Sequence, residues 1–154
     1  MPSRSLLGTS IRAGQAALLY LCRRAVGLQE ASRYCLPDAQ LGALSNIFAV
    51  NVEAISGVAI KPDSEFAKMH GDVVATTRFN TIYLAGSGDE FAADHKLLLH
   101  EYFHVIRQWN TGELTVGRYV WELLRKGYWR NKYEIAARQF ADDYVEAFRQ
   151  ALRR

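Results

Sequence analysis

Two histidines and a glutamate in the segment HKLLLHEYFHVIRQWN, residues 95–110, have the types and spacing of a metal site. His100 and His104 are four residues apart, so in a helix both imidazoles lie on one face and can bind the same ion. Glu101 lies about 100° around the helix from His100, where its carboxylate can reach a water on that ion. This H-E-x-x-H pattern is typical of zinc-dependent hydrolases, in which the carboxylate takes a proton from the water.

The alternative is that two histidines fall by chance on a buried helix. The residues around the pattern are strongly apolar: Leu97, Leu98, Leu99, Phe103, Val105 and Ile106. Burial of two imidazoles and a carboxylate in such a run is unfavourable unless their polar atoms have partners, and a metal ion satisfies all three groups at once. We therefore predict that this helix binds Zn²⁺.

Zinc sites of this kind need a third protein ligand. The longer metzincin pattern would place a glycine and a histidine at positions 107 and 110, which here are Arg107 and Asn110, so that class is excluded. No histidine follows His104, so a third ligand further along the chain must be a carboxylate. The candidates are Glu113, Glu122, Glu134, Asp142, Asp143 and Glu146.

Glu134 fits the role of third ligand best. Ala137 and Ala141 follow it at helical spacing, and their small side chains let a helix pack closely against the metal-binding helix. The competing interpretation is a solvated residue in a first helical turn, where a negative charge is favoured. We predict His100, His104 and Glu134 as metal ligands and Glu101 as the catalytic base.

The elements that must position these residues can be predicted from patterning and from helix end signals. The class is α+β, a small antiparallel sheet or hairpin followed by a helical bundle that carries H-E-x-x-H on a central helix. The expected segments are a helix from Asp38, a strand in 56–63, a short helix in 63–71, a hairpin in 72–86, and helices over 86–112, 115–126 and 131–152.

Length and composition fit one globular domain. The chain has 154 residues, of which 49% are hydrophobic and 23% charged, so we expect a single domain over 1–154 with a helical N-terminal part over 1–50. The 19 basic and 16 acidic residues are too balanced to require a nucleic-acid or membrane partner. Several basic residues gather between 118 and 132, which indicates either a solvated helix face or a surface for an acidic partner.

The N-terminal segment has basic residues and then an apolar run, Ala16 to Cys22, that is too short to span a bilayer. Arg23 and Arg24 interrupt any signal-peptide cleavage site, so we expect an amphipathic helix. Cys22 and Cys35 are the only cysteines, and two free thiols in a reducing compartment are the simplest interpretation. The expected location is the cytoplasm.

His100, Glu101, His104 and a helical Glu134 resemble the arrangement of the gluzincin zinc metallopeptidases. More narrowly, VAIKPDSEFAKMHG, TIYLAGSG and LLLHEYFHVIRQW are similar in order and spacing to a small predicted metallopeptidase domain found beside toxins and extracellular contractile injection systems. The similarity spans residues 55–145. It implies a zinc peptidase with a peptide or protein substrate, and export that needs no signal peptide. The alternative is an inactive metal-binding protein that interacts with a secretion apparatus.

The chain departs from the gluzincin pattern in two places. The aspartate that orients the first histidine in thermolysin-like members is replaced by Arg138, so another group, such as Asp142 or a backbone carbonyl, must take that part. The downstream histidine that stabilises the oxyanion in some members is also absent. Tyr128, Tyr133 and Arg107 remain as alternative donors.

The segment NTIYL, residues 80–84, allows two interpretations. It could be an open sheet edge to which an extended peptide substrate adds as a further strand. It could equally be an ordinary strand in the interior of the sheet.

Overall fold

The computed structural model describes residues 33–69 and 74–153, so the amphipathic helix expected before residue 33 lies outside the described residues. The elements in chain order are α2 (Asp38–Phe48), α3 (Val52–Ser56), β1 (Ala59–Lys61), α4 (Glu65–Lys68), β2 (Ala75–Arg78), β3 (Thr81–Leu84), α5 (Gly88–Ala93), α6 (His95–Phe103), the π-helix η1 (His104–Trp109), α7 (Val116–Lys126), the 3₁₀-helix η2 (Tyr128–Arg130) and α8 (Lys132–Ala151). The predicted α+β class is confirmed, because a small sheet precedes the long helices.

The sheet has the strand order β1-β3-β2. β2 and β3 form the predicted antiparallel hairpin, in which Thr77 pairs with Ile82, and β1 adds to β3 in parallel. Of the two interpretations of residues 80–84, the open edge is wrong and the interior strand is confirmed, because β3 is paired on both of its sides. In the part of the chain that the structure describes, β2 pairs with β3 alone, so the open edge is that of β2.

Strand alternation gives the sheet one apolar face. Ile60 of β1 pairs with Ile82 of β3, and Ala75 of β2 pairs with Leu84, and all four side chains are buried. Side chains two residues apart on a strand point the same way, so Thr77 shares this face with Ala75. A hydroxyl is thereby placed on a face that otherwise buries hydrocarbon.

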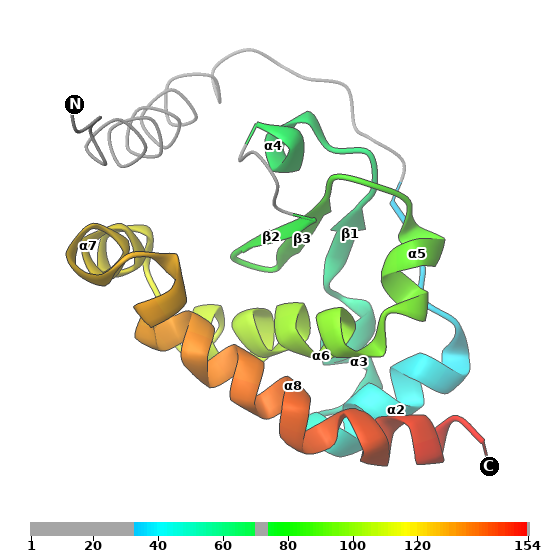
Figure 1. Cartoon of the computed structure of the whole chain (residues 1–154). Helices are drawn as coiled ribbons and strands as arrows, with labels where there is room; N and C mark the ends of the chain where they lie inside the picture. Colours follow the sequence, from blue (N-terminus) through cyan, green and yellow to red (C-terminus); the bar gives the residue numbers. More distant parts are fainter. Residues whose placement is uncertain (1–32, 70–73, 154) are drawn as a thin grey trace, which may run out of the picture.

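Helix α6 lies between this sheet and α8, as Figure 1 shows. The core around α6 combines side chains from all parts of the described chain, including Phe48, Ile55, Leu98, Tyr102 and Phe148, each at most 1% exposed. His100 and Glu101 therefore lie on a helix surrounded by core side chains, and His104 follows directly at the start of η1. Burial of these side chains stabilises the fold by about 1.5–3 kcal/mol each, which fixes the position of α6.

The prediction of one continuous helix over 86–112 is wrong, because this segment contains α5, α6 and η1. The chain breaks at Asp94, whose backbone is not helical and whose carboxylate accepts a hydrogen bond from the amide of Leu97 at the start of α6. Ser87 and Glu90 form a capping box at the start of α5. The break lets α5 and α6 point in different directions, so that α6 can run beneath the sheet.

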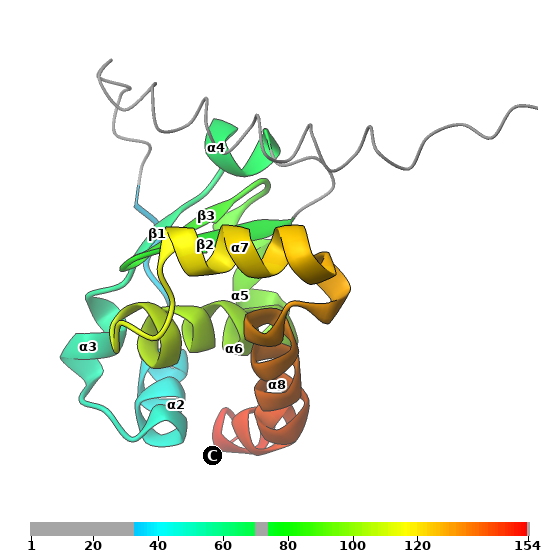
Figure 2. The same cartoon turned by 90° about the vertical axis from the view of Figure 1, so that its left-hand side faces the viewer.

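The helices expected over 115–126 and 131–152 are confirmed as α7 and α8. Thr115 caps α7, and Gly127 ends it with a φ of 74°, a backbone conformation that favours glycine. Figures 1 and 2 show α7 on the same side of α6 as the sheet, beside the β2–β3 hairpin. Among the described residues, no helix has the length and apolar character needed to cross a membrane.

Candidate metal centre

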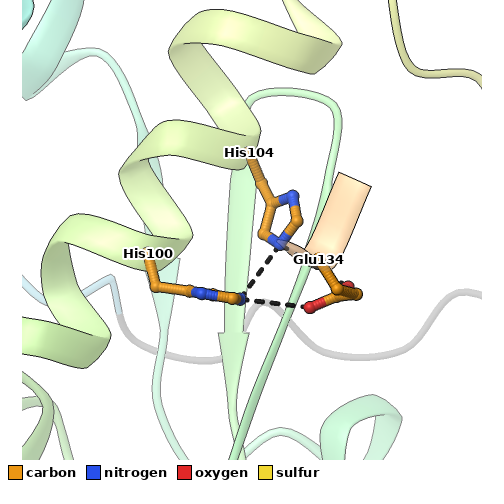
Figure 3. Close-up of side chains that lie close together, drawn as sticks. All are labelled: His100, His104 and Glu134. Atoms are coloured by element: carbon orange, nitrogen blue, oxygen red, sulfur yellow. Dashed lines mark hydrogen bonds and ion pairs between the residues drawn. The ribbon is translucent and has the colours of Figure 1, made fainter. Parts of the chain in front are cut away.

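His100, His104 and Glu134 come together as a potential metal site at the junction of α6, η1 and α8. One potential ligand atom from each residue lies within 4.8 Å of the other two. The Nε2 atoms of the two histidines are 3.1 Å apart, His100 Nε2 lies 3.2 Å from Glu134 Oε2, and His104 Nε2 lies 3.6 Å from Glu134 Oε1. Figure 3 shows the three side chains pointing toward one another.

These separations agree with a tetrahedral ion. Zinc binds imidazole nitrogen and carboxylate oxygen at about 2.0–2.2 Å, so two ligand atoms on one tetrahedral ion are about 3.4 Å apart. The distance between the two Nε2 atoms, 3.1 Å, and the distance from His100 Nε2 to Glu134 Oε2, 3.2 Å, lie close to that value, and the other carboxylate oxygen, Oε1, lies 3.6 Å from His104 Nε2. Two imidazoles and one carboxylate are also the ligand set of catalytic zinc sites that leave a fourth position for water. The residues therefore fit a bound zinc ion.

Small side chains allow α8 to pack closely against α6, as the sequence predicted. Ala137 and Ala141 are fully buried between the two helices, one and two turns after Glu134. Asn131 caps α8 through its side chain, which accepts a hydrogen bond from the amide of Tyr133. The cap fixes where the helix starts, and Glu134 in the first turn is thereby aimed at the histidines.

Glu101 is not part of the group that the three potential ligands form. Its side chain is buried, and its Oε2 accepts a hydrogen bond of 2.5 Å from the hydroxyl of Thr77 on β2. The strand thus holds one carboxylate oxygen of Glu101 in place. Sequence reasoning did not place Thr77 beside Glu101, although strand alternation puts Thr77 on the inward face of the sheet.

Gln108 is a second residue that sequence reasoning did not place in the site. It is buried on η1, donates from Nε2 to the backbone carbonyl of Tyr133, and lies with Oε1 2.7 Å from His104 Nδ1. Because the amide nitrogen is used at Tyr133, the oxygen accepts the proton of Nδ1. His104 Nε2 then presents a lone pair toward His100 and Glu134, which is the tautomer that a metal needs.

The π-helical turn η1 contains both His104 and Gln108. The chain leaves α-helical hydrogen bonding at His104, and the amide of Asn110 donates to the carbonyl of Val105 at 2.9 Å. Such turns are frequent at functional sites because they change the direction of side chains along a helix. Here the turn begins at a potential ligand and contains Gln108, the residue that orients it.

Two tyrosines border Glu134. The hydroxyl of Tyr119 on α7 donates to Glu134 Oε1 at 2.9 Å. Burial, and then the charge of Glu134, raise the pKa of the Tyr119 phenol, and the same two causes raise the pKa of Tyr128. Both hydroxyls therefore keep their protons and act as donors at neutral pH. Tyr128 was among the expected donors, whereas Tyr119 was missed, since no spacing links it to H-E-x-x-H.

The histidines and Glu134 perturb one another. Burial alone would raise the pKa of the Glu134 carboxyl, but hydrogen bonds and charge from His100 and His104 lower it below its ordinary value. Burial alone would lower the pKa of His104, but Glu134 outweighs it and raises that pKa. The site therefore favours a positive charge opposite a carboxylate.

Several residues considered from the sequence have other partners. Asp142 forms an ion pair with Lys96, and the Arg107 guanidinium donates to the carbonyl of Phe48. The remaining interactions are these: the hydroxyl of Tyr133 donates to the carbonyl of Glu113, Arg138 donates to the carbonyl of Trp129, and Glu122 pairs with Lys126. Of the carboxylates considered as third ligand, the described structure brings Glu134 to the two histidines, and not Glu113, Glu122, Asp142, Asp143 or Glu146.

No protein-family model matches the chain, and no curated protein or solved structure matches it either.

Proposed function

We propose that the protein is a zinc-dependent peptidase. The observation that carries this proposal is the convergence of His100, His104 and Glu134 on one point, with Glu101 beside them but outside the ligand group. A structural metal site needs ligands only, and a buried carboxylate next to them would be an unfavourable addition. A hydrolytic site needs that carboxylate to accept a proton from water.

Zinc is the proposed metal because two imidazoles and one carboxylate are the ligand set of known catalytic zinc sites. When bound, the ion would lower the pKa of a water and polarise a peptide carbonyl. Glu101 would take the proton of that water and pass it to the nitrogen of the leaving amine. Thr77 would hold Oε2 of Glu101, so that the proton is accepted on Oε1.

Tyr119 is the proposed donor to the negative charge that develops on the carbonyl oxygen. Its hydroxyl lies 2.9 Å from Glu134 Oε1, so it borders the position where a substrate carbonyl would approach. A neutral donor held in place on a helix can strengthen its hydrogen bond as that charge grows. This assignment supplies the function of the histidine that the gluzincin pattern has and this chain lacks.

The open edge of β2 is the proposed binding site for the peptide backbone. An extended peptide can add to a free strand edge through its backbone amides and carbonyls. β2 carries Thr77, which contacts Glu101, so a peptide along this edge would pass directly beside the base. The strand would thereby orient the scissile bond as well as the catalytic carboxylate.

The test is hydrolysis of a denatured-protein or peptide library by the zinc-loaded protein and by Glu101→Gln, with zinc content measured in the same samples. We expect Glu101→Gln to keep zinc and fold but to lose cleavage, because an amide fills the same space without accepting a proton. Glu113→Gln is the matched control, since Glu113 is exposed and should leave cleavage unchanged.

The outcomes separate three accounts. Cleavage by the wild-type protein and its loss in Glu101→Gln support the peptidase. Zinc binding with no cleavage of any library member would contradict it and favour a metal-binding interaction protein of a secretion or contractile injection apparatus. Loss of zinc in Glu101→Gln would make Glu101 a ligand.

A further inference from the structure

A hollow of about 230 Å³ lies at one end of the sheet, where the start of β2 and the end of β3 meet the helices α5 and α6. Four apolar side chains form its walls: Val74, Leu84, Phe91 and Leu97. Pockets that take whole small-molecule ligands have volumes of about 300–1,000 Å³, so this smaller hollow suits one long side chain. It is therefore a candidate seat for a single side chain of a bound peptide.

The hollow lies next to the proposed catalytic groups. On α6, Leu97 precedes Glu101 by four residues, so the two side chains share one face and are about 6 Å apart along the helix. On the strand side, Val74 precedes Thr77 by three residues, or about 10 Å, and Thr77 contacts Glu101. A peptide that follows the open edge of β2 past Glu101 would therefore reach the hollow within three residues.

Two carboxylates, those of Glu90 and Asp94, complete the lining, whose other members, Gly86 and Ser87, are uncharged. Glu90 Oε2 accepts hydrogen bonds from Ser87, and Asp94 Oδ1 accepts one from the amide of Leu97. The second oxygens, Glu90 Oε1 and Asp94 Oδ2, accept no hydrogen bond from a described residue. Neither carboxylate forms an ion pair with a cation of the described chain.

The helix ends do not cancel the charge of these two carboxylates. Glu90 lies in the first turn of α5 and Asp94 caps α6, and each helix start carries about half a positive charge. Two carboxylates beside two such ends leave about one negative charge in the hollow. This charge lies at the rim, because Glu90 and Asp94 are exposed, whereas Leu84 and Phe91 are buried at 1% and 3% exposure. The hollow thus combines apolar walls with an anionic rim.

We propose that this hollow is a specificity subsite of the peptidase and takes a Lys or Arg side chain of the substrate. The aliphatic stem would lie along the apolar walls, and the charged end would pair with Glu90 and Asp94 at the rim. An apolar side chain would contact the same walls but leave both carboxylates unpaired, and an acidic side chain would be repelled. The place of this residue near the scissile bond rests on the proposed function, whereas the preference for a cation rests on the lining alone.

The test uses the full zinc-loaded chain with Glu101→Gln, which should leave bound peptides uncut, and fluorescence anisotropy with three labelled peptides. The peptides share one uncharged sequence except for a single central residue, which is Arg, norleucine or Glu. We expect the Arg peptide to bind at least about tenfold more tightly than the norleucine peptide, and the Glu peptide to bind most weakly. Added salt should weaken binding of the Arg peptide alone, because the attraction between exposed charges is screened.

Variants locate the cation-binding groups. Glu90→Gln/Asp94→Asn removes both charges, while the amide oxygens can still accept the hydrogen bonds that cap α5 and α6. We expect binding of the Arg peptide to fall to the level of the norleucine peptide, whose own binding should change less than about twofold. The matched control is Glu53→Gln/Glu113→Gln, which changes net charge equally at two exposed positions outside the hollow and should keep the preference for Arg.

Cleavage of the same peptides by the wild-type protein separates this inference from the proposed function. Fragment masses should place Arg at one fixed position, on one side of the cut and within three residues of it. No cleavage of any peptide would contradict the peptidase, and the binding series would still decide whether the hollow takes a cation.

Three results would overturn the subsite: equal binding of the Arg and norleucine peptides, a preference for Arg that persists in a folded Glu90→Gln/Asp94→Asn protein, or cleavage with no fixed position of Arg. If the double variant does not fold, Asp94→Asn alone and the salt series decide, and a preference for Arg that neither of them weakens would overturn the subsite as well.

Discussion

Replacement of Gln108 tests how the site orients His104, a proposed metal ligand. Gln108 is 1% exposed and makes two buried contacts, one with His104 Nδ1 at 2.7 Å and one with the carbonyl of Tyr133 at 3.1 Å. Gln108→Leu keeps the volume but leaves both partners unpaired. Each unpaired buried polar group costs about 1–3 kcal/mol, so the free energy of unfolding should fall by about 2–6 kcal/mol.

Metal affinity should fall as well, because the imidazole of His104 loses the group that fixes its tautomer and ring orientation. Loss of such a partner typically weakens metal binding by about 10–100-fold. Gln108→Glu separates this effect from stability, since the carboxylate still accepts the proton of Nδ1 but cannot donate to Tyr133. We expect Gln108→Glu to be destabilised and yet to bind zinc within a few-fold of the wild type.

The assay is zinc titration against a competing chromophoric chelator, with urea unfolding of the metal-free proteins alongside. Gln139→Leu is the matched control, because Gln139 lies exposed on α8 with Asp143 as its partner. Unchanged zinc affinity in a folded Gln108→Leu protein would refute the reasoning, since Gln108 would then be a core residue with no effect on His104 as a ligand.

Three further predictions concern the ligands, the donor and pH. Glu134→Ala should weaken zinc affinity by at least about tenfold, whereas Glu122→Ala should change it little, and the reverse order in a chelator titration would move the third ligand to α7. Tyr119→Phe should lower kcat by about 10²–10³ while zinc affinity changes little, with Tyr144→Phe on α8 as an inert control, and an unchanged kcat would remove Tyr119 from the reaction. The pKa of His104 is raised in the folded protein, so His104 stabilises the metal-free protein below its ordinary pKa of 6.5 and loses this contribution as pH rises through the folded value. The pKa of Glu134 is lowered, so Glu134 stabilises the metal-free protein above its ordinary pKa of 4.5 and loses this contribution on acidification. Zinc requires neutral imidazoles, so zinc should raise Tm more at about pH 7.5 than at about pH 5.5, and thermal melts that show an equal or smaller rise at the higher pH would contradict this linkage.

The convergence of the three candidate ligands was predictable because its signals are local or follow from elimination. His100 and His104 meet through helical periodicity, and Glu134 emerged from the absence of later histidines and from Ala137 and Ala141, which are indeed buried against α6. The α+β class followed from the order of β-rich and helical segments.

The residues around the ligands were harder to predict because they depend on tertiary contacts. Tyr119 reaches Glu134 from α7, which follows the turn at Gly112, and Thr77 reaches Glu101 because β2 packs against α6 and η1. The helix break at Asp94 was hidden by a pattern that reads as one continuous helix. Local periodicity cannot show where a helix changes direction, whereas the cap formed by Asp94 does.

The most direct test of the account is a crystal structure of the zinc-loaded protein with anomalous diffraction measured on both sides of the zinc absorption edge. The account predicts one zinc peak within about 2.0–2.2 Å of Nε2 of His100, Nε2 of His104 and a carboxylate oxygen of Glu134. Glu101 should lie outside this coordination sphere, with Oε2 on Thr77. A peak at another place, or a zinc ion bound by Glu101 in place of Glu134, would contradict the account.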